Sequence, residues 1–387
     1  MLYLDHAATS PVRPEVLEAM RPYLTGVFGN PSSHHRVGEA AAEALEWARG
    51  RVAAALGMRA NDVIFTSGGT ESNNLAVKGI VLAALPHASG AEGPARRSIV
   101  TTPIEHESLL ESAAYLHRFH DVSVTILPVD AHGRASPKDL AEALESKDAA
   151  LVTFGHANNE VGTVQDAESL IAVAQERGVP VHVDAVQSAG WLPLDALGAD
   201  AISIAGHKLG TPKGIGALGV RSRVPLEPLL HGGGQERGRR SGTENVAGAV
   251  GLATALDLVA VERAQHAGAV AAQTSEFIAA VREAVPQASL TGSADHRLPN
   301  LASFTFAGTS GEAVLLELER RGVISSSGSA CAAGSDEPSP VLLALGIPAT
   351  TAQTSVRFTF ARTPLPAGSA THLASLVAAA VAAVVSP

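Results

Sequence analysis

The chain has 387 residues, of which 46% are apolar and 17% are charged, and its formal net charge is −10. This composition permits a large buried core, argues against an intrinsically disordered chain, and favours two or three domains. The negative charge and the aromatic content of only 4% argue against nucleic acids and anionic membranes as partners.

The single cysteine, Cys331, can form neither an intramolecular disulfide nor a zinc site built from cysteines, and we expect no bound metal. No basic segment followed by an apolar run is visible near Met1, so no signal peptide is predicted. The apolar run at residues 376–385 is too short to cross a bilayer. We therefore expect a soluble cytoplasmic protein.

The first predicted elements surround a Gly-rich turn. Residues 2–36 are expected to be mostly irregular because prolines interrupt them, and residues 38–56 predict a helix. Residues 63–67 predict a strand and residues 74–84 a helix, with the turn at residues 68–73 between them. The free N–H groups at the start of such a helix can bind a phosphate, although a Gly-rich cap without a ligand is the alternative.

Strands and helices then alternate as far as residue 205. This alternation predicts a mostly parallel α/β sheet with helices on both faces. Further along, residues 246–285 predict a long helix that connects to a second domain. The other expected strands are 98–102, 122–127, 151–154, 181–184, 201–205, 215–220, 302–306 and 355–360, and the other expected helices are 105–119, 140–144, 167–177 and 311–321.

Polar side chains gather where the predicted strands end. Ligands of open α/β sheets bind at the carboxyl ends of the strands, so these side chains are expected to form one site. Lys208 follows a buried run, where a free cation is costly, whereas a neutral amine can form a Schiff base with a carbonyl. The alternative is a lysine that starts an exposed loop. The polar residues at the strand ends are Thr70, His106, Asn159, Asp184, Gln187, His207 and Lys208.

Together these residues match the needs of pyridoxal 5′-phosphate, a flat ring with an aldehyde and a phosphate arm. Lys208 would take the aldehyde, and Asp184 would keep the ring nitrogen protonated. Gln187 would donate to the ring hydroxylate, and His106 would stack on the ring and move protons. The candidates for the phosphate are Gly69, Thr70, His207 and Thr243, the last in a Gly/Arg-rich loop that suits an anion.

Cys331 lies in a small, polar stretch, residues 325–335, and not in an apolar periodic run. A thiol in such a stretch can reach a substrate atom, and only its thiolate is nucleophilic. An inert cysteine is the alternative.

The chain resembles the cysteine desulfurases, pyridoxal-phosphate enzymes of the class-V aminotransferase family, and it does so nearly end to end. The resemblance rests on long motifs that occur in the family's order. In this sequence they read YLDHAATSPV, FGNPSSHH, FTSGGTESNNLA, IEHESL, NNEVGTVQ, HVDAVQSAG, GHKLGTPKGIGAL, HGGGQERGRRSGTEN, SGSACAAGS and VRFTFAR.

The resemblance implies the aspartate-aminotransferase-like fold, fold type I of the pyridoxal-phosphate-dependent transferases. A large α/β domain with a mostly parallel, seven-stranded sheet would span residues 16–256. A smaller α+β domain, which carries the cysteine, would consist of residues 1–15 and 257–387. The resemblance also implies a homodimer, and a partner protein that accepts sulfur or serves as an iron–sulfur scaffold.

The implied reaction converts L-cysteine to L-alanine. Cys331 would take the sulfur as a persulfide and pass it on for iron–sulfur cluster or thio-cofactor synthesis, in the manner of the cluster-assembly type of the family. Asn30 and Arg357 would hold the substrate carboxylate, a task that suits the fork of an arginine. Thr243 would reach the phosphate of the partner subunit. The residues that the resemblance assigns to the cofactor are Gly69, Thr70, His106, Asn159, Asp184, Gln187, His207, Lys208 and Thr243.

Three positions depart from the family pattern. Ala205 stands where a serine is usual, so one hydroxyl for the phosphate is missing. Leu209 stands where an aromatic residue often follows the lysine. Pro340 replaces the histidine of a usual Ser-His-Val and should stiffen the base of the cysteine loop.

Two other functions stay open. A related enzyme, either a selenocysteine lyase or an aminotransferase, is one, and an aminotransferase would have no need of Cys331. A sulfur carrier or scaffold protein that has kept the fold is the other, and it should tolerate the loss of Lys208.

Overall fold

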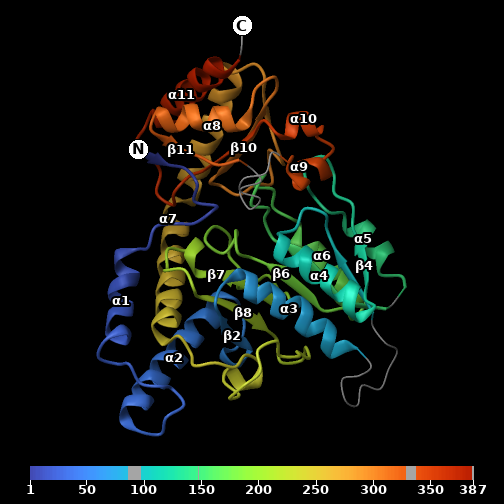
Figure 1. Ribbon diagram of the computed structural model, residues 1–387, viewed down its shortest axis with the longest axis vertical. Helices are drawn as coiled ribbons and strands as arrows, with labels where there is room; N and C mark the ends of the chain where they lie inside the picture. The colour runs from blue at the N-terminus through green and yellow to red at the C-terminus, as the bar shows by residue number, and fades with distance from the viewer. Residues whose placement is uncertain (86–96, 147, 328–336, 386–387) are drawn as a thin grey trace.

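The computed structural model describes residues 1–85, 97–146, 148–327 and 337–385. Its larger part is built on a seven-stranded sheet with the order β2-β8-β7-β6-β5-β3-β4, flanked by helices (Figure 1). Only β8 is antiparallel to its neighbours in this sheet, so the prediction of a mostly parallel α/β sheet is confirmed. The strands are β2 (Val63–Thr66), β3 (Ser98–Thr101), β4 (Ser123–Ile126), β5 (Ala149–Gly155), β6 (Val181–Asp184), β7 (Ala201–Ala205) and β8 (Gly216–Val220).

The sheet is covered on both faces because consecutive residues of its central strands point to opposite sides. On β5, Leu151 packs in one buried cluster with Leu75 and Leu109, and Val152 packs in another with Leu170. The helices around the sheet are α2 (Arg36–Ala55), α3 (Gly69–Ala84), α4 (Glu107–His120), α5 (Pro137–Ala143) and α6 (Ala167–Glu176), and the short 3₁₀ turns are η1 (Ala60–Asp62), η2 (Gly206–Lys208) and η3 (Glu236–Gly238).

The helix α7 (Val246–Ala284) connects this part to a second one, as Figure 1 shows. Val250 lies in the core of the large sheet, whereas Phe277 lies in a separate core around a three-stranded antiparallel sheet of order β12-β10-β9. The second part contains β1 (Leu2–Tyr3), β9 (Ala288–Leu290), β10 (Leu301–Phe306), β11 (Val323–Ile324), β12 (Ser355–Thr359), α8 (Gly311–Arg320), α9 (Pro340–Ala344), α10 (Ala349–Ala352) and α11 (Ser369–Val384).

The first strand, β1, pairs in parallel with β11, and Leu4 lies in the core of the second part. The N-terminus therefore packs with the C-terminal region, far away in the sequence. This packing supports the division into residues 16–256 and residues 1–15 with 257–387, which stays a prediction. In the part of the chain that the structure describes, no helix has both the length and the hydrophobicity that a membrane crossing requires.

The expectation of irregular backbone over residues 2–36 is wrong for its middle part, where α1 (Pro14–Leu24) forms. Pro14 begins the helix, where its missing N–H group costs nothing, and the second proline falls in the last turn. Val16 and Met20 are buried against α7. Gly251 allows this close approach, because a Cβ atom there would lie 2.7 Å from Sδ of Met20.

Candidate active site

A cavity of about 350 Å³ lies at the carboxyl ends of the parallel strands β5, β6 and β7. Parallel strands bring the loops that follow them to one edge of the sheet, and the N-termini of α3 and α4 complete the wall. The second part of the molecule adds Arg357 from β12, and Ala7 and Ala8 from the N-terminal segment. The predicted residues that line this cavity are Gly69, Thr70, His106, Asn159, Asp184, Gln187, His207, Lys208 and Arg357.

Lys208 is half-buried in η2, directly after β7. Its Nζ donates to the carbonyl oxygen of Ala8 at 2.8 Å and to that of Ala7. The backbone of the lysine is also held, because Nη2 of Arg362 donates to the Lys208 carbonyl oxygen at 2.8 Å. The amine is therefore positioned at the cavity by uncharged carbonyl groups of the N-terminal segment.

Asp184 is the last residue of β6, and its carboxylate is buried. One oxygen accepts from the backbone N–H of Val186 at 2.9 Å, and the other accepts from Nδ2 of Asn73 at 2.7 Å. Both contacts fix the orientation of the carboxylate at the end of β6. The sequence analysis did not identify Asn73. The available signal was a polar residue on the buried face of α3, one turn after Gly69.

His106 caps the N-terminus of α4. Its Nδ1 accepts from the backbone N–H of Ser108 at 3.1 Å and lies 2.8 Å from the hydroxyl of the same serine. The serine hydroxyl in turn accepts from Nδ2 of Asn73 at 2.9 Å. The imidazole thus has a fixed orientation at the cavity wall.

Two carboxyl groups next to motif residues, the buried Glu105 and the half-buried Glu160, were not identified from the sequence. Glu105 accepts from Oγ1 of Thr102 at 2.5 Å and from the backbone N–H of Gly155 at 2.6 Å, and burial raises its pKa to about 8. Glu160 accepts from Oγ of Ser339, and burial raises its pKa to about 7. Apolar periodicity cannot indicate such residues, because they depend on donors from distant segments.

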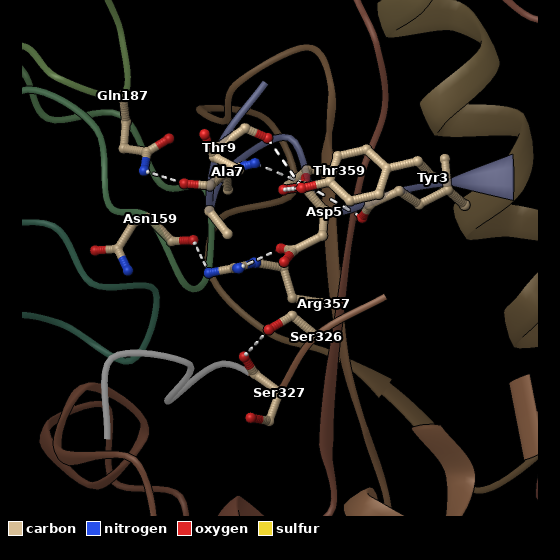
Figure 2. A network of polar contacts seen from close by, with 12 residues as sticks. Tyr3, Asp5, Ala7, Thr9, Asn159, Gln187, Ser326, Ser327, Arg357 and Thr359 are labelled. Carbon is tan, nitrogen blue, oxygen red and sulfur yellow. Dashed lines mark hydrogen bonds and ion pairs between the residues drawn. The ribbon is translucent and has the colours of Figure 1, made fainter. Parts of the chain in front are cut away.

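Arg357 lies in β12 and is only 2% exposed. Figure 2 shows its guanidinium between Asn159 and Asp5. Nη1 donates to the carbonyl oxygen of Asn159 at 2.8 Å, and Nη2 donates to Oδ1 of Asp5 at 2.7 Å. Nε is buried and has no hydrogen-bond partner among the described residues. Asp5 therefore orients this arginine, a role that the sequence analysis did not assign.

Gln187 and His207 are tied to the N-terminal segment. Nε2 of Gln187 donates to the carbonyl oxygen of Ala7 at 3.0 Å (Figure 2), and Nδ1 of His207 lies 3.2 Å from Oγ1 of Thr9. Burial, together with the charge of Lys208, lowers the pKa of His207 to about 4. His207 is therefore neutral near pH 7 and would contact a phosphate as a hydrogen-bonding group rather than as a cation.

The three departures from the family pattern have defined places. Ala205 is buried and lines the cavity, and Leu209 is buried in the core of the large sheet. Pro340 is the first residue of α9, and Ser339 caps that helix by accepting from the backbone N–H of Leu342 at 3.2 Å. Proline is favourable at this helix position because its φ angle is already helical.

Two predicted site residues that the structure describes are not brought to this cavity. Asn30 and Thr243 are exposed and do not line it. Cys331 lies outside the described residues.

Pyridoxal 5′-phosphate fits the groups that do meet here. An amine and a fixed, buried carboxylate line one cavity, as the aldehyde and the pyridine nitrogen require. Oδ1 of Asn73 is buried in this wall, and no described residue donates to it. At the start of α3, a Cβ atom on Gly69 would lie 2.7 Å from Cγ2 of Val186, so a side chain there would narrow the cavity.

Comparison with known proteins agrees with this geometry. Residues 2–364 match the family described as Aminotransferase class-V. The chain belongs to the class-V aminotransferase family. The predicted family and the aspartate-aminotransferase-like fold are thereby confirmed, and members of this family use pyridoxal phosphate.

The similar proteins in this family carry related names. The chain is 45% identical to "IscS-like cysteine desulfurase" of Mycobacterium tuberculosis, over 95% of this chain and 93% of that protein. It is 43% identical to "Cysteine desulfurase IscS" of Dictyoglomus turgidum, over 92% of this chain and 89% of that protein.

Solved structures show the same relationship. A "NifS-like protein" is 32% identical with a TM-score of 0.89, over 99% of this chain and 100% of that one. "SspA in complex with cysteine" is 34% identical with a TM-score of 0.79, over 94% of this chain and 100% of that one.

Proposed function

We propose that the protein is a pyridoxal-phosphate-dependent cysteine desulfurase, which converts L-cysteine to L-alanine and passes the sulfur through Cys331 to an acceptor. The observation that carries this proposal is the meeting of Lys208, Asp184 and His106 around one cavity. It occurs in a chain that is 39–45% identical to proteins named cysteine desulfurase.

The residues around the cavity divide the task of holding the cofactor. Lys208 would offer the amine for its aldehyde, Asp184 would pair with its ring nitrogen, and Gln187 with Asn159 would bind its hydroxyl group. The start of α3 at Gly69 and Thr70, with His207, holds its phosphate. When bound, pyridoxal phosphate supplies an electron sink that stabilises negative charge on the substrate.

Other residues act on the substrate. Arg357 binds the carboxylate of L-cysteine, and its fixed orientation between Asp5 and Asn159 prepares it for this anion. His106 stacks on the ring and moves protons; because Nδ1 accepts from Ser108, Nε2 is the nitrogen that carries the transferable proton. The Cys331 thiolate takes the substrate sulfur as a persulfide, and the remaining three carbons leave as alanine.

We also infer a homodimer. Asn30 and Thr243 lie outside the cavity of their own chain, and large apolar side chains are exposed on α1, on α2 and in the loop between them. A second copy could cover this surface and bring a residue such as Thr243 to its neighbour's site. The exposed apolar residues are Leu17, Leu24, Phe28, Val37 and Trp47. The reaction is expected in the cytoplasm, with a sulfur acceptor or iron–sulfur scaffold protein as the partner.

The proposal is tested by comparing the wild type with Cys331→Ala. Both should bind pyridoxal phosphate, as seen in the visible spectrum, but only the wild type should release alanine and sulfide from L-cysteine. Full alanine and sulfide production by the variant would refute a desulfurase that uses Cys331. A wild-type protein without cofactor absorbance would indicate a sulfur carrier instead.

A further inference from the structure

Asn73 connects Asp184 to Ser108 and, through Ser108, to His106 in the wall of the cavity. Its Nδ2 donates to Oδ2 of Asp184 at 2.7 Å and to the hydroxyl of Ser108 at 2.9 Å, and that hydroxyl lies 2.8 Å from Nδ1 of His106. Asn73 is 1% exposed, so water does not compete for these bonds. The chain Asp184–Asn73–Ser108–His106 is called the relay below.

The direction of every hydrogen bond in the relay follows from its first member. An ionised carboxylate only accepts, so the side-chain atom of Asn73 that faces Asp184 must be the NH₂ group. The second hydrogen of this NH₂ group points to Ser108, whose oxygen must therefore accept it. The serine has one hydrogen of its own, and it is directed to Nδ1 of His106.

The last bond decides the tautomer of the histidine. Nδ1 then accepts from both the hydroxyl and the backbone N–H of Ser108, so it cannot carry a proton. The proton of the neutral ring is on Nε2. Two donors at Nδ1 also oppose the imidazolium form, because protonation of Nδ1 would break both bonds.

We propose that Asn73 and Ser108 are positioning residues that couple Asp184 to His106, so that the ionised aspartate holds the histidine as the neutral Nε2–H tautomer. The catalytic meaning rests on the proposed function, in which Asp184 faces the ring nitrogen and His106 moves protons. In the proposed reaction, the relay keeps the proton of the neutral His106 ring on Nε2, the nitrogen that Ser108 does not contact.

Other charged groups also act on His106, and the test must separate them from the relay. Glu105 is buried and Glu160 is half-buried nearby, and desolvation raises the pKa of each of these carboxyl groups. The relay is distinguished from them because it acts through one hydroxyl, which can be removed. Among the described residues, the titratable and charged groups that adjoin His106, interact with it or share its cavity wall are Glu105, Glu107, Glu160, Asp184, His207, Lys208 and Arg357.

The test uses nitrogen chemical shifts of histidine in the cofactor-free protein, with His106→Gln to assign the signal. The wild type should show the neutral Nε2–H tautomer. Asn73→Leu, which cannot donate, frees the Ser108 hydroxyl to turn, and should raise the pKa of His106 by about one unit. Asn73→Asp should raise it further, because it adds a second carboxylate beside Asp184.

The decisive comparison repeats Asn73→Leu in a Ser108→Ala background. The relay predicts no further shift there, because the connection is already broken, whereas a general loosening of the site would shift the pKa of His106 equally in both backgrounds. Equal shifts, or an Nδ1–H tautomer in the wild type, would overturn the proposal. Ser112→Ala is the matched control, since among the described residues this buried serine of α4 donates only to the carbonyl oxygen of Ser108. The change should leave the titration of His106 unchanged.

If Asn73→Leu does not fold, the proposal is still tested by the tautomer of His106 in the wild type and by the change of its pKa in Ser108→Ala. A loss of the hydroxyl donor should raise the pKa of His106, and an unchanged value would overturn the relay. Because the spectra are recorded without cofactor or substrate, they are independent of desulfuration. A protein with an intact relay that releases no sulfide would contradict the proposed function alone.

Discussion

At the scale of single residues, the candidate active site is distinguished by acidic side chains that have little contact with solvent. Asp184 and Glu105 are buried near His106, and Glu160 is half-buried there. A carboxylate without donors is costly in such surroundings, and each of these has at least one. The donors from other segments come from α3, from the backbone of Gly155 at the end of β5 and from the start of α9, so each acid connects two segments.

Replacing Asp5 tests how Arg357 is held. Asp5→Asn removes the charge beside Nη2, while the bond from Nη1 to Asn159 remains. We expect KM for L-cysteine to rise about tenfold with kcat little changed, because the arginine is less well fixed but still present. Steady-state alanine formation measures both constants. Asp257→Asn, which removes a surface ion pair, should leave KM unchanged, and an equal rise there would count against this role of Asp5.

The pKa of Glu105 makes a prediction about stability. The pKa is raised from 4.5 to about 8 in the folded protein, so the folded state keeps a proton that the unfolded state loses. Stability is therefore lost as pH rises from about 4.5 through about 8. Glu105→Gln cannot ionise, and we expect it to equal the wild type at pH 5 and to exceed it by on the order of 3 kcal/mol at pH 9.

Urea unfolding at both pH values measures this difference. Glu283→Gln, a change at an exposed carboxyl group of α7, should follow the wild type at both. A Glu105→Gln protein that lost stability in parallel with the wild type between the two pH values would contradict the prediction.

At the scale of elements, the N-termini of three helices position residues in and around the site. His106 caps α4, Gly69 begins α3 and Ser339 caps α9, and each start also contributes to the cavity or to its surroundings. The N–H groups of a first turn lack partners within the helix, so a side chain or a ligand must satisfy them. Two of these residues, His106 and Ser339, therefore contribute to the site or its surroundings and also satisfy an N–H group at a helix start.

Two Ser-Pro caps allow a matched experiment. Ser339 caps α9 and also donates to Glu160, whereas Ser136 caps α5 without a carboxylate partner among the described residues. We expect Ser136→Ala to cost about 1 kcal/mol of unfolding free energy at both pH 5.5 and pH 8.5. Ser339→Ala should cost about the same at pH 5.5, where Glu160 is protonated, and about 2 kcal/mol at pH 8.5.

The larger cost of Ser339→Ala at pH 8.5 follows from the pKa of Glu160, which burial raises to about 7. Above that value the group is an anion and depends more strongly on the serine hydroxyl. Thermal unfolding of the variants at the two pH values provides the measurement. A pH-independent cost for Ser339→Ala would show that the contact with Glu160 adds nothing to the cap.

At the scale of the whole molecule, the site is assembled from distant parts of the chain. The sheet supplies Asp184 and Lys208, and Arg357 comes from a strand of the second part. The helix α7 spans both cores, so the two parts are connected by a continuous rigid element. Exposed apolar residues on α1 and α2 leave a surface that a second copy could cover.

The proposed dimer predicts complementation between two inactive chains. When Lys208→Ala and Thr243→Ala chains are co-expressed with different tags, the mixed dimer should contain one site with both residues intact. Random pairing should give about a quarter of the wild-type alanine formation, because half of the dimers are mixed and each has one of two sites. If Thr243 serves its own chain, no activity above that of the two parents will appear.

Local sequence patterns determined the strands, turns and helix starts that carry most of the predicted site residues. The turn before α3, the strand that ends at Asp184 and the strand before Lys208 are each visible in a few consecutive residues, because strand, turn and helix starts have local signatures. Parallel strands then predict that these ends share one edge, and nine predicted residues do line one cavity. Their individual roles stay predictions.

Only the tertiary structure decided the rest. Two prolines concealed α1, which forms because Val16 and Met20 pack on α7, and packing outweighs a local break. The partners of Asp5 and Asn73 lie 352 and 111 residues away, so a local pattern can place Asn73 on the buried face of α3 but cannot predict what either residue binds. The direction of the hydrogen bonds is likewise a property of the folded chain. The sequence contains an aspartate and a histidine, but the hydrogen bonds through Asn73 determine which ring nitrogen of that histidine carries the proton.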